Sequence, residues 1–453
     1  MNIDFTHRHR LSYRGLEVEW PLRLLHIPSM TSFERNGTCE YLGIERPQYA
    51  IITYTWGRFT APDGGPALPV EGTTWVIPPV HCFSVELFFA TIKNIGSRYD
   101  WLWLDVACID QIDEQVKMAE VARQVGIFHG AAEAFAWLHS LDSLVACRSI
   151  SILAEIGGYD VLGQDHVWDY ETEQLRLNLS LNYYRVRLDS VEKALQALIA
   201  DPWFTSLWTL QESILRRDAQ LLSADGEPIL YETQEMGDTK QACTIALLNG
   251  WCAGIWHDLK YYANGRKLSK AEQVQASTIT NLIERVGLNF ASAINPNVQY
   301  GAARFRETKY PKDRVYGIYG IYRTVFPSSF RLPGPAEVTP DELELFFASA
   351  LNKFCPWIAQ CFVHLAQPRP GHSWCITQDS TVPKSIVYIP EKDITSDPQE
   401  SGAGTSDPII IYLTLKLKAI FSKEILCGAC NGNSAQSSVV TGNAWDSFSC
   451  GMT

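Results

Sequence analysis

The sequence lacks the features of several protein classes. It has no block of consecutive lysines or arginines, and its net charge is −12, so the basic surface of a typical nucleic-acid-binding protein is missing. No stretch reaches the roughly 18 apolar residues that a membrane helix needs. The first 15 residues contain no apolar segment of the kind found in secretory signals. These absences predict no nucleic-acid partner, no membrane span and a cytoplasmic location.

Common catalytic and metal-binding motifs are also absent. The chain has no P-loop, no GxGxxG fingerprint, no HExxH and no GxSxG. Its 12 cysteines are scattered singly, and Cys427 and Cys430 form a lone CxxC without a second pair. A closed structural zinc site uses four ligands, so we expect no metal at this CxxC.

A second group of ligand-type residues has closer spacing, C-x2-H followed by H-x2-C. It consists of Cys361, His364, His372 and Cys375. This set could close a tetrahedral zinc site. We favour the alternative of a buried helix end at Cys361 and a buried strand around Trp374 and Cys375, and we predict no metal.

The residues that are present describe a folded protein. With 46% hydrophobic and 11% aromatic residues in 453, the chain can build a large core, and its length predicts two or three domains. Apolar runs at 49–54, 101–106 and 134–138 read as buried strands, and 114–130 reads as an amphipathic helix whose polar face includes Gln124. Strand, helix and strand with short connections predict an α/β fold with a small parallel sheet.

The rest of the chain reads as mainly helical. A helix is expected from Ser190, and further helices around 240–262, 270–292 and 313–323. Another should begin at Pro340, with Thr339 and Glu342 forming a capping box. The predicted organisation is a lead-in at 1–45, an α/β domain at 46–225 with a helical insertion at 140–200, a mainly helical region at 226–390 and a partly disordered tail at 391–453.

Several short blocks, in order, resemble the fungal heterokaryon-incompatibility (HET) domain family. They are Arg23–His26 (RLLH), 49–57 (YAIITYTWG), 103–111 (WLDVACIDQ), Trp203-Phe204 with 208–212 (WTLQE), and 313–320 (DRVYGIYG). One departure is that family members usually carry a Glu-Arg pair where this chain has Gln115-Val116-Lys117. The resemblance implies self/non-self recognition and cell-death signalling.

The same blocks are remotely similar to TIR domains. That second resemblance implies a TIR-like site that hydrolyses NAD, with NAD as substrate and no resident cofactor. A carboxylate could stabilise the sugar cation formed when the nicotinamide–ribose bond breaks, as in glycoside hydrolysis. Glu212 is our candidate catalytic residue, with Trp208 one helical turn before it. Trp56 and Asp105 are candidate substrate-binding residues, because ligands bind at the carboxyl ends of parallel strands.

Alternatives stay open at this point. Glu212 could pair with Arg216 on a solvated helix, and Asp105 could anchor the loop that follows it. Trp56 and Trp208 could be core residues. At the level of function, the alternative is a non-enzymatic module that signals by self-assembly and responds to a protein trigger, and a third is a diverged gene product without either function.

Overall fold

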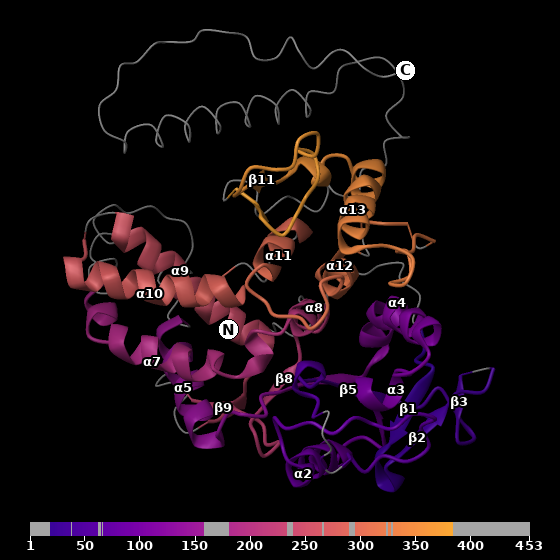
Figure 1. The fold of residues 1–453 in the computed structure, drawn as a ribbon. Helices are drawn as coiled ribbons and strands as arrows, with labels where there is room; N and C mark the ends of the chain where they lie inside the picture. The colour runs from indigo at the N-terminus through magenta and orange to yellow at the C-terminus, as the bar shows by residue number, and fades with distance from the viewer. Residues whose placement is uncertain are drawn as a thin grey trace, which may run out of the picture. The chain divides into compact units, whose positions relative to one another are not determined.

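A six-stranded sheet lies at the centre of the N-terminal part of the chain (Figure 1). The computed structural model describes residues 19–383, except 38, 62–64, 66, 158–180, 233–238, 265–266, 290–294, 323–324 and 328. The strands run in the order β2-β1-β6-β5-β7-β8. Their bounds are β1 (Arg23–His26), β2 (Thr31–Glu34), β5 (Tyr49–Thr53), β6 (Trp101–Trp103), β7 (Glu133–Trp137) and β8 (Gln220–Leu222).

The middle of this sheet is parallel. Strand β5 pairs in parallel with β6 on one side and with β7 on the other, and β7 pairs in parallel with β8. All five residues of β5 are buried, as expected for a strand covered on both faces. The predicted adjacency of the strands at 49–54, 101–106 and 134–138 in one parallel sheet is confirmed, and so is the α/β fold class with a helical C-terminal part.

Two details of the sheet differ from the expectation. The strand at 101–106 ends at Trp103, because Asp105 accepts a hydrogen bond from the backbone N–H of Val106 (2.7 Å) and opens the short helix α3 (Asp105–Cys108). The predicted lead-in at Arg23–His26 is a strand of the sheet, antiparallel to β2 and to β6. The sheet is therefore mixed at this side.

Helices surround the sheet and fill the rest of the described chain. They are α2 (Val85–Gly96), α4 (Glu114–Gly130), α5 (Ser143–Gly157), α7 (Leu188–Ile199), α8 (Leu207–Leu215), α9 (Ile245–Asn264), α10 (Lys270–Val286), α11 (Pro296–Ala303), α12 (Asp313–Tyr319) and α13 (Pro340–Phe354). The 3-10 turns are η1 (Ile27–Ser29), η2 (Gly57–Phe59), η3 (Pro202–Phe204), η5 (Gly320–Tyr322) and η6 (Ile358–Gln360). Two-stranded ladders pair β3 (Glu40–Tyr41) with β4 (Ile44–Glu45), β9 (Leu230–Tyr231) with β10 (Gln241–Ala242), and β11 (Val363–His364) with β12 (Ser380–Thr381).

Some helix boundaries were predicted and others were not. Helix α7 begins at Leu188, so the expected cap at Ser190 is wrong; Val191, Leu195 and Leu198 are buried, as the helical spacing predicts. The capping box of Thr339 and Glu342 at the start of α13 is confirmed. The boundaries of the predicted domains stay predictions, and the predicted tail at 391–453 lies outside the described residues.

Two apolar cores meet at helix α8. The first core contains the sheet and the group formed by α5, α7, α9 and α10, drawn in magenta and pink in Figure 1. The second core lies among α11, α12 and α13. Leu215 of α8 belongs to the first core, whereas Leu207 and Leu210 belong to the second. Helix α8 is therefore buried between two layers.

No helix in the described part of the chain combines the length and the hydrophobicity needed to cross a membrane.

Candidate functional site

A cleft of about 700 Å³ lies where strands β5 and β6 end. Its wall includes all four residues singled out from the sequence, Trp56, Asp105, Trp208 and Glu212. Trp56 and Asp105 come from the segments that follow the two strands, and the other two come from helix α8. Ligands bind at this end of open parallel sheets. The roles of the four residues in chemistry stay predictions.

Glu212 lies at the buried side of the cleft, with 8% of its surface exposed. The hydroxyl of Thr53, the last residue of β5, donates to its Oε2. The side-chain amide of Gln124 donates to its Oε1 at 3.4 Å. The pKa of Glu212 is raised to about 8: burial is the main cause and the nearby negative charge of Asp105 adds to it, whereas the two hydrogen bonds oppose the shift.

The alternative role for Glu212, an ion pair with Arg216 on a solvated helix, is wrong. The Arg216 guanidinium pairs with Asp218 at 2.8 Å and donates to the backbone carbonyls of Phe128 and Ala131. Helix α8 is not solvated either, because every residue except Trp208 is buried. The two cores that cover α8 remove Glu212 from bulk water.

Asp105 is both an anchor and a wall of the cleft. Its carboxylate accepts hydrogen bonds from the indole N–H of Trp56 and from the backbone N–H of Val106. Burial raises its pKa, and these hydrogen bonds oppose the shift. Burial and the neighbouring Asp105 carboxylate raise the pKa of Tyr54 well above its ordinary value. The site therefore has two carboxylates at its floor, each held by an aromatic or hydroxyl donor from the end of β5.

Trp208 connects the cleft to the second core. Its indole N–H donates to Asp313 Oδ2 at 3.3 Å, and the Thr308 hydroxyl donates to the same oxygen at 2.8 Å. Burial raises the pKa of Asp313. Trp208 is only partly buried and lines the cleft, so the interpretation of this residue as core alone is incomplete.

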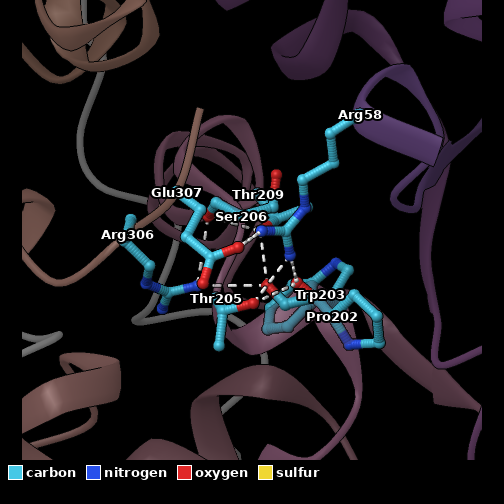
Figure 2. A network of polar contacts seen from close by, with 8 residues as sticks. All are labelled: Arg58, Pro202, Trp203, Thr205, Ser206, Thr209, Arg306 and Glu307. Carbon is cyan, nitrogen blue, oxygen red and sulfur yellow. Dashed lines mark hydrogen bonds and ion pairs between the residues drawn. The ribbon is translucent and has the colours of Figure 1, made fainter. Parts of the chain in front are cut away.

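The sequence pattern missed Arg58, which joins two parts of the chain across the cleft. Figure 2 shows its guanidinium between the backbone of Pro202 and the side chains of Thr205 and Glu307. It donates to Pro202 O at 3.1 Å and to Thr205 Oγ1 at 2.7 Å, and it forms an ion pair with Glu307. These partners are more than 140 residues away in sequence, so no local signal identified them.

The segment that carries Glu307 is itself fixed by Arg306 (Figure 2). Arg306 is 3% exposed and donates to the carbonyls of Trp203 (3.0 Å), Ser206 (3.3 Å) and Val286 (2.5 Å). Burial, together with the nearby positive charge of Arg58, lowers its pKa to about 9. Thus one buried arginine ties the start of α8 to the 307–313 wall of the cleft.

The cleft has acidic groups at its floor and basic groups toward its mouth. The carboxylates of Asp105 and Glu212 lie at the floor, whereas Lys309 is exposed at the mouth and Lys117 is partly exposed. Two buried polar atoms of the wall, Thr55 Oγ1 and Arg58 Nε, have no hydrogen-bond partner within the described residues. Buried polar atoms are normally paired. These two donors would suit an anionic group of a bound molecule.

Gln124 is a second residue at the cleft whose position the sequence pattern did not predict correctly. The sequence put it on the polar face of the helix at 114–130, but it is only 4% exposed and contacts Glu212. Helix α4 packs against α8, and a polar residue at the contact is covered by tertiary structure. Periodicity could not show this, because both faces of the C-terminal half of α4 are buried.

The four residues with metal-ligand spacing make other contacts. His364 Nε2 lies 3.1 Å from Ser373 O, and His372 Nδ1 lies 3.0 Å from Pro370 O. The predicted buried strand around Trp374 is wrong, because Trp374 is 40% exposed in a turn. Across the described ranges, no three or more His, Cys, Asp or Glu side chains are grouped to hold a metal ion. Cys427 and Cys430 lie outside the described residues.

Comparison with known proteins identifies one domain. The family model described as "Heterokaryon incompatibility protein (HET)" matches residues 49–212. Neither a curated protein nor a solved structure matches the chain. The matched segment begins at β5 and ends at Glu212, so it includes the floor of the cleft but not the wall formed by 307–313.

Proposed function

We propose that this chain, whose residues 49–212 form a HET domain, acts in self/non-self recognition and signals cell death by hydrolysing NAD in the cleft around Glu212. The observation that carries the proposal is a buried carboxylate, held by two hydrogen-bond donors, in a cleft at the ends of parallel strands that Trp208 also lines. The protein would act in the cytoplasm, in response to a protein trigger and with self-assembly.

Hydrolysis of the nicotinamide–ribose bond needs few catalytic groups from the protein. The bond between ribose C1′ and the nicotinamide nitrogen breaks, its electron pair goes to the nicotinamide ring, and water adds to C1′ with release of a proton. Because the leaving group is already cationic, no general acid is needed. The Glu212 carboxylate would stabilise the developing positive charge on the sugar. The indole of Trp208 would form an apolar wall beside the sugar.

The distribution of charged groups in the cleft is complementary to the charges of NAD. Carboxylates at the floor suit the cationic nicotinamide ribose and its hydroxyls. Lys117 and Lys309 nearer the mouth suit the diphosphate, as do the unpaired donors Thr55 Oγ1 and Arg58 Nε. A ligand with a cationic end and an anionic end would therefore enter in one orientation.

A nicotinamide-release assay with purified protein tests the proposal. Glu212→Gln keeps the size of the side chain but removes its charge, so we expect NAD cleavage to fall by at least about 100-fold while the fold survives. Asp105→Asn should weaken cleavage less, because Asp105 is also an anchor. Glu192→Gln, at a half-buried position of α7 that does not line the cleft, is the matched control and should cleave NAD as the parent does.

A second candidate function is a non-enzymatic interaction module. Val76 and Ile112, on the rim of the cleft, are 82% and 75% exposed, and exposed apolar side chains suit contact with another protein. If Glu212→Gln kills cells as well as the parent does, the catalytic proposal is wrong and this alternative takes its place.

A further inference from the structure

A chain of buried amides runs from Glu212 to the 3-10 turn η5. The backbone N–H of Gly320 donates to Gln211 Oε1 at 2.6 Å. Gln211 Nε2 donates to Gln124 Oε1 at 2.9 Å, and Gln124 Nε2 donates to Glu212 Oε1 at 3.4 Å. Gln211 and Gln124 are only 2% and 4% exposed. Because water does not reach these amides, each must find its partner in this chain.

The direction of every hydrogen bond in the chain follows from its first donor. A backbone N–H can only donate, so Gly320 requires the carbonyl end of the Gln211 amide. The NH₂ end of Gln211 then faces the carbonyl of Gln124, and the NH₂ end of Gln124 faces Glu212. Reversing any one amide would bring two donors or two acceptors together. The carboxylate therefore receives a donor from this side.

A second chain reaches the other oxygen of the carboxylate. The indole N–H of Trp203 donates to Thr53 Oγ1 at 3.1 Å, and an indole nitrogen can only donate. The Thr53 hydroxyl proton is then free to point to Glu212 Oε2. Both chains thus begin at a group that only donates and end at Glu212. Hydrogen bonds from two donors favour the ionised form, so they oppose the larger effect of burial, which raises the pKa of Glu212.

We propose that Gln124 and Gln211 are positioning residues, which aim the Glu212 side chain at the substrate in those molecules in which it is ionised, and make its placement depend on the segment 313–322. This role rests on the proposed function of Glu212. The segment lies outside the HET match, yet it closes tightly on the chain of amides: a Cβ at Gly320 would lie 2.6 Å from Gln211 Oε1. Movement of η5 would therefore displace Gln211 and, through Gln124, change the hydrogen bonding of the Glu212 carboxylate.

Other charged groups also act on Glu212. The nearest acidic one is Asp105, whose charge raises the pKa of Glu212. The remaining charged side chains of the cleft are Arg58, Lys117, Glu307, Lys309 and Asp313. The test below leaves all of them in place, so a change in the titration of Glu212 reports on the amides.

Replacement of the middle amide tests the proposal. Gln211→Met has a similar length but can neither accept from Gly320 nor donate to Gln124, so we expect the pKa of Glu212 to rise. The readout is the carboxyl ¹³C NMR signal of Glu212 in glutamate-labelled full-length protein, assigned from the spectrum of Glu212→Gln. In the NAD assay, kcat at neutral pH should fall roughly tenfold for each unit of the rise, with less change in KM.

A matched control and a second variant keep the result interpretable. Gln299→Met replaces a glutamine of similar burial (1% exposed) on α11 and should leave the titration unchanged. Gly320→Ala acts from the other end by pushing Gln211 away, and it should shift the titration in the same direction as Gln211→Met. Its control is Gly250→Ala on α9, where a Cβ meets nothing within 4 Å.

An unchanged titration of Glu212 in both Gln211→Met and Gly320→Ala would overturn the proposal, even if activity were lost. If the titration shifts but the parent protein releases no nicotinamide, the proposed substrate is wrong while the linkage of Gln124 and Gln211 to Glu212 is supported. The two failures are therefore distinguishable.

Discussion

The two cores of the molecule contribute to the cleft in different ways. The sheet-containing core supplies the floor: strand ends bring Trp56 and Asp105, and their positions follow from the order of strands. The part of the chain with the second core, which is rich in tyrosine and phenylalanine, makes individual polar contacts to cleft residues and their neighbours through residues 307–320. A family match can therefore contain the candidate reactive groups of a site without the groups that hold them in place.

Three of the polar contacts from residues 307–320 reach three different residues in or beside the floor of the cleft. Glu307 holds Arg58, Asp313 holds Trp208, and Gly320 holds Gln211. Each of these three partners lies beyond the matched segment 49–212. An isolated matched segment would therefore lose one wall of the cleft and the Gly320 end of one of the two hydrogen-bond chains. The following predictions separate the contribution of the floor from that of the wall.

The largest effect is expected at the floor, in the pH dependence of stability. With a pKa of about 8 against an ordinary value of 4.5, Glu212 keeps its proton in the folded protein over a range in which the unfolded chain has lost it. This group's contribution to stability is therefore complete below about pH 4.5 and is lost as pH rises through about 8. The free energy of unfolding should fall by up to about 1.4 kcal/mol per pH unit in this window, relative to Glu212→Gln.

Urea unfolding of the parent and of Glu212→Gln at several pH values measures this slope. Glu342→Gln is the control from the other core, because hydrogen bonds of the capping box lower the pKa of Glu342 and no slope is expected between pH 4.5 and 8. Equal pH dependence in the parent and in Glu212→Gln would show that Glu212 is not buried as described.

The next largest effect on stability is expected at Arg306, which joins the start of α8 to the wall of the cleft at 307–313. Arg306→Met leaves the carbonyls of Trp203, Ser206 and Val286 without this donor, and we expect a loss of about 3 kcal/mol in the free energy of unfolding. Chemical denaturation measures the loss. Arg331→Met, at an exposed position, should change stability by less than about 0.5 kcal/mol. Equal effects of the two replacements would mean that Arg306 does not fix the joint.

The smallest effect is expected for the ion pair between Arg58 and Glu307. Glu307 is 70% exposed, so a double-mutant cycle with Arg58→Met and Glu307→Gln should give a coupling of less than about 1 kcal/mol. The coupling should weaken further as salt is added. A coupling larger than about 1 kcal/mol that does not respond to salt would mean that the Arg58–Glu307 ion pair is a main link between the wall at 307 and the floor of the cleft.

Some of the site could be predicted from sequence. The resemblance to the HET and TIR blocks selected Glu212, Trp208, Trp56 and Asp105. Local pattern agreed with this choice, because Glu212 and Trp208 lie four residues apart on one helix, and Trp56 and Asp105 lie at the ends of apolar runs of strand type. Gln124 and Arg58 could not be selected in this way. Their partners are distant in sequence, and a glutamine on a helix reads as exposed unless the packing around it is known.

Local sequence pattern was sufficient for the α/β class and the parallel core of the sheet, because a continuous apolar run needs cover on both faces and short strand–helix–strand connections favour parallel neighbours. The tertiary structure alone decided the surroundings of Glu212. Whether this carboxylate meets water or amides depends on α4, η5 and β5 closing around α8, and such long-range packing leaves no periodic signal in the chain.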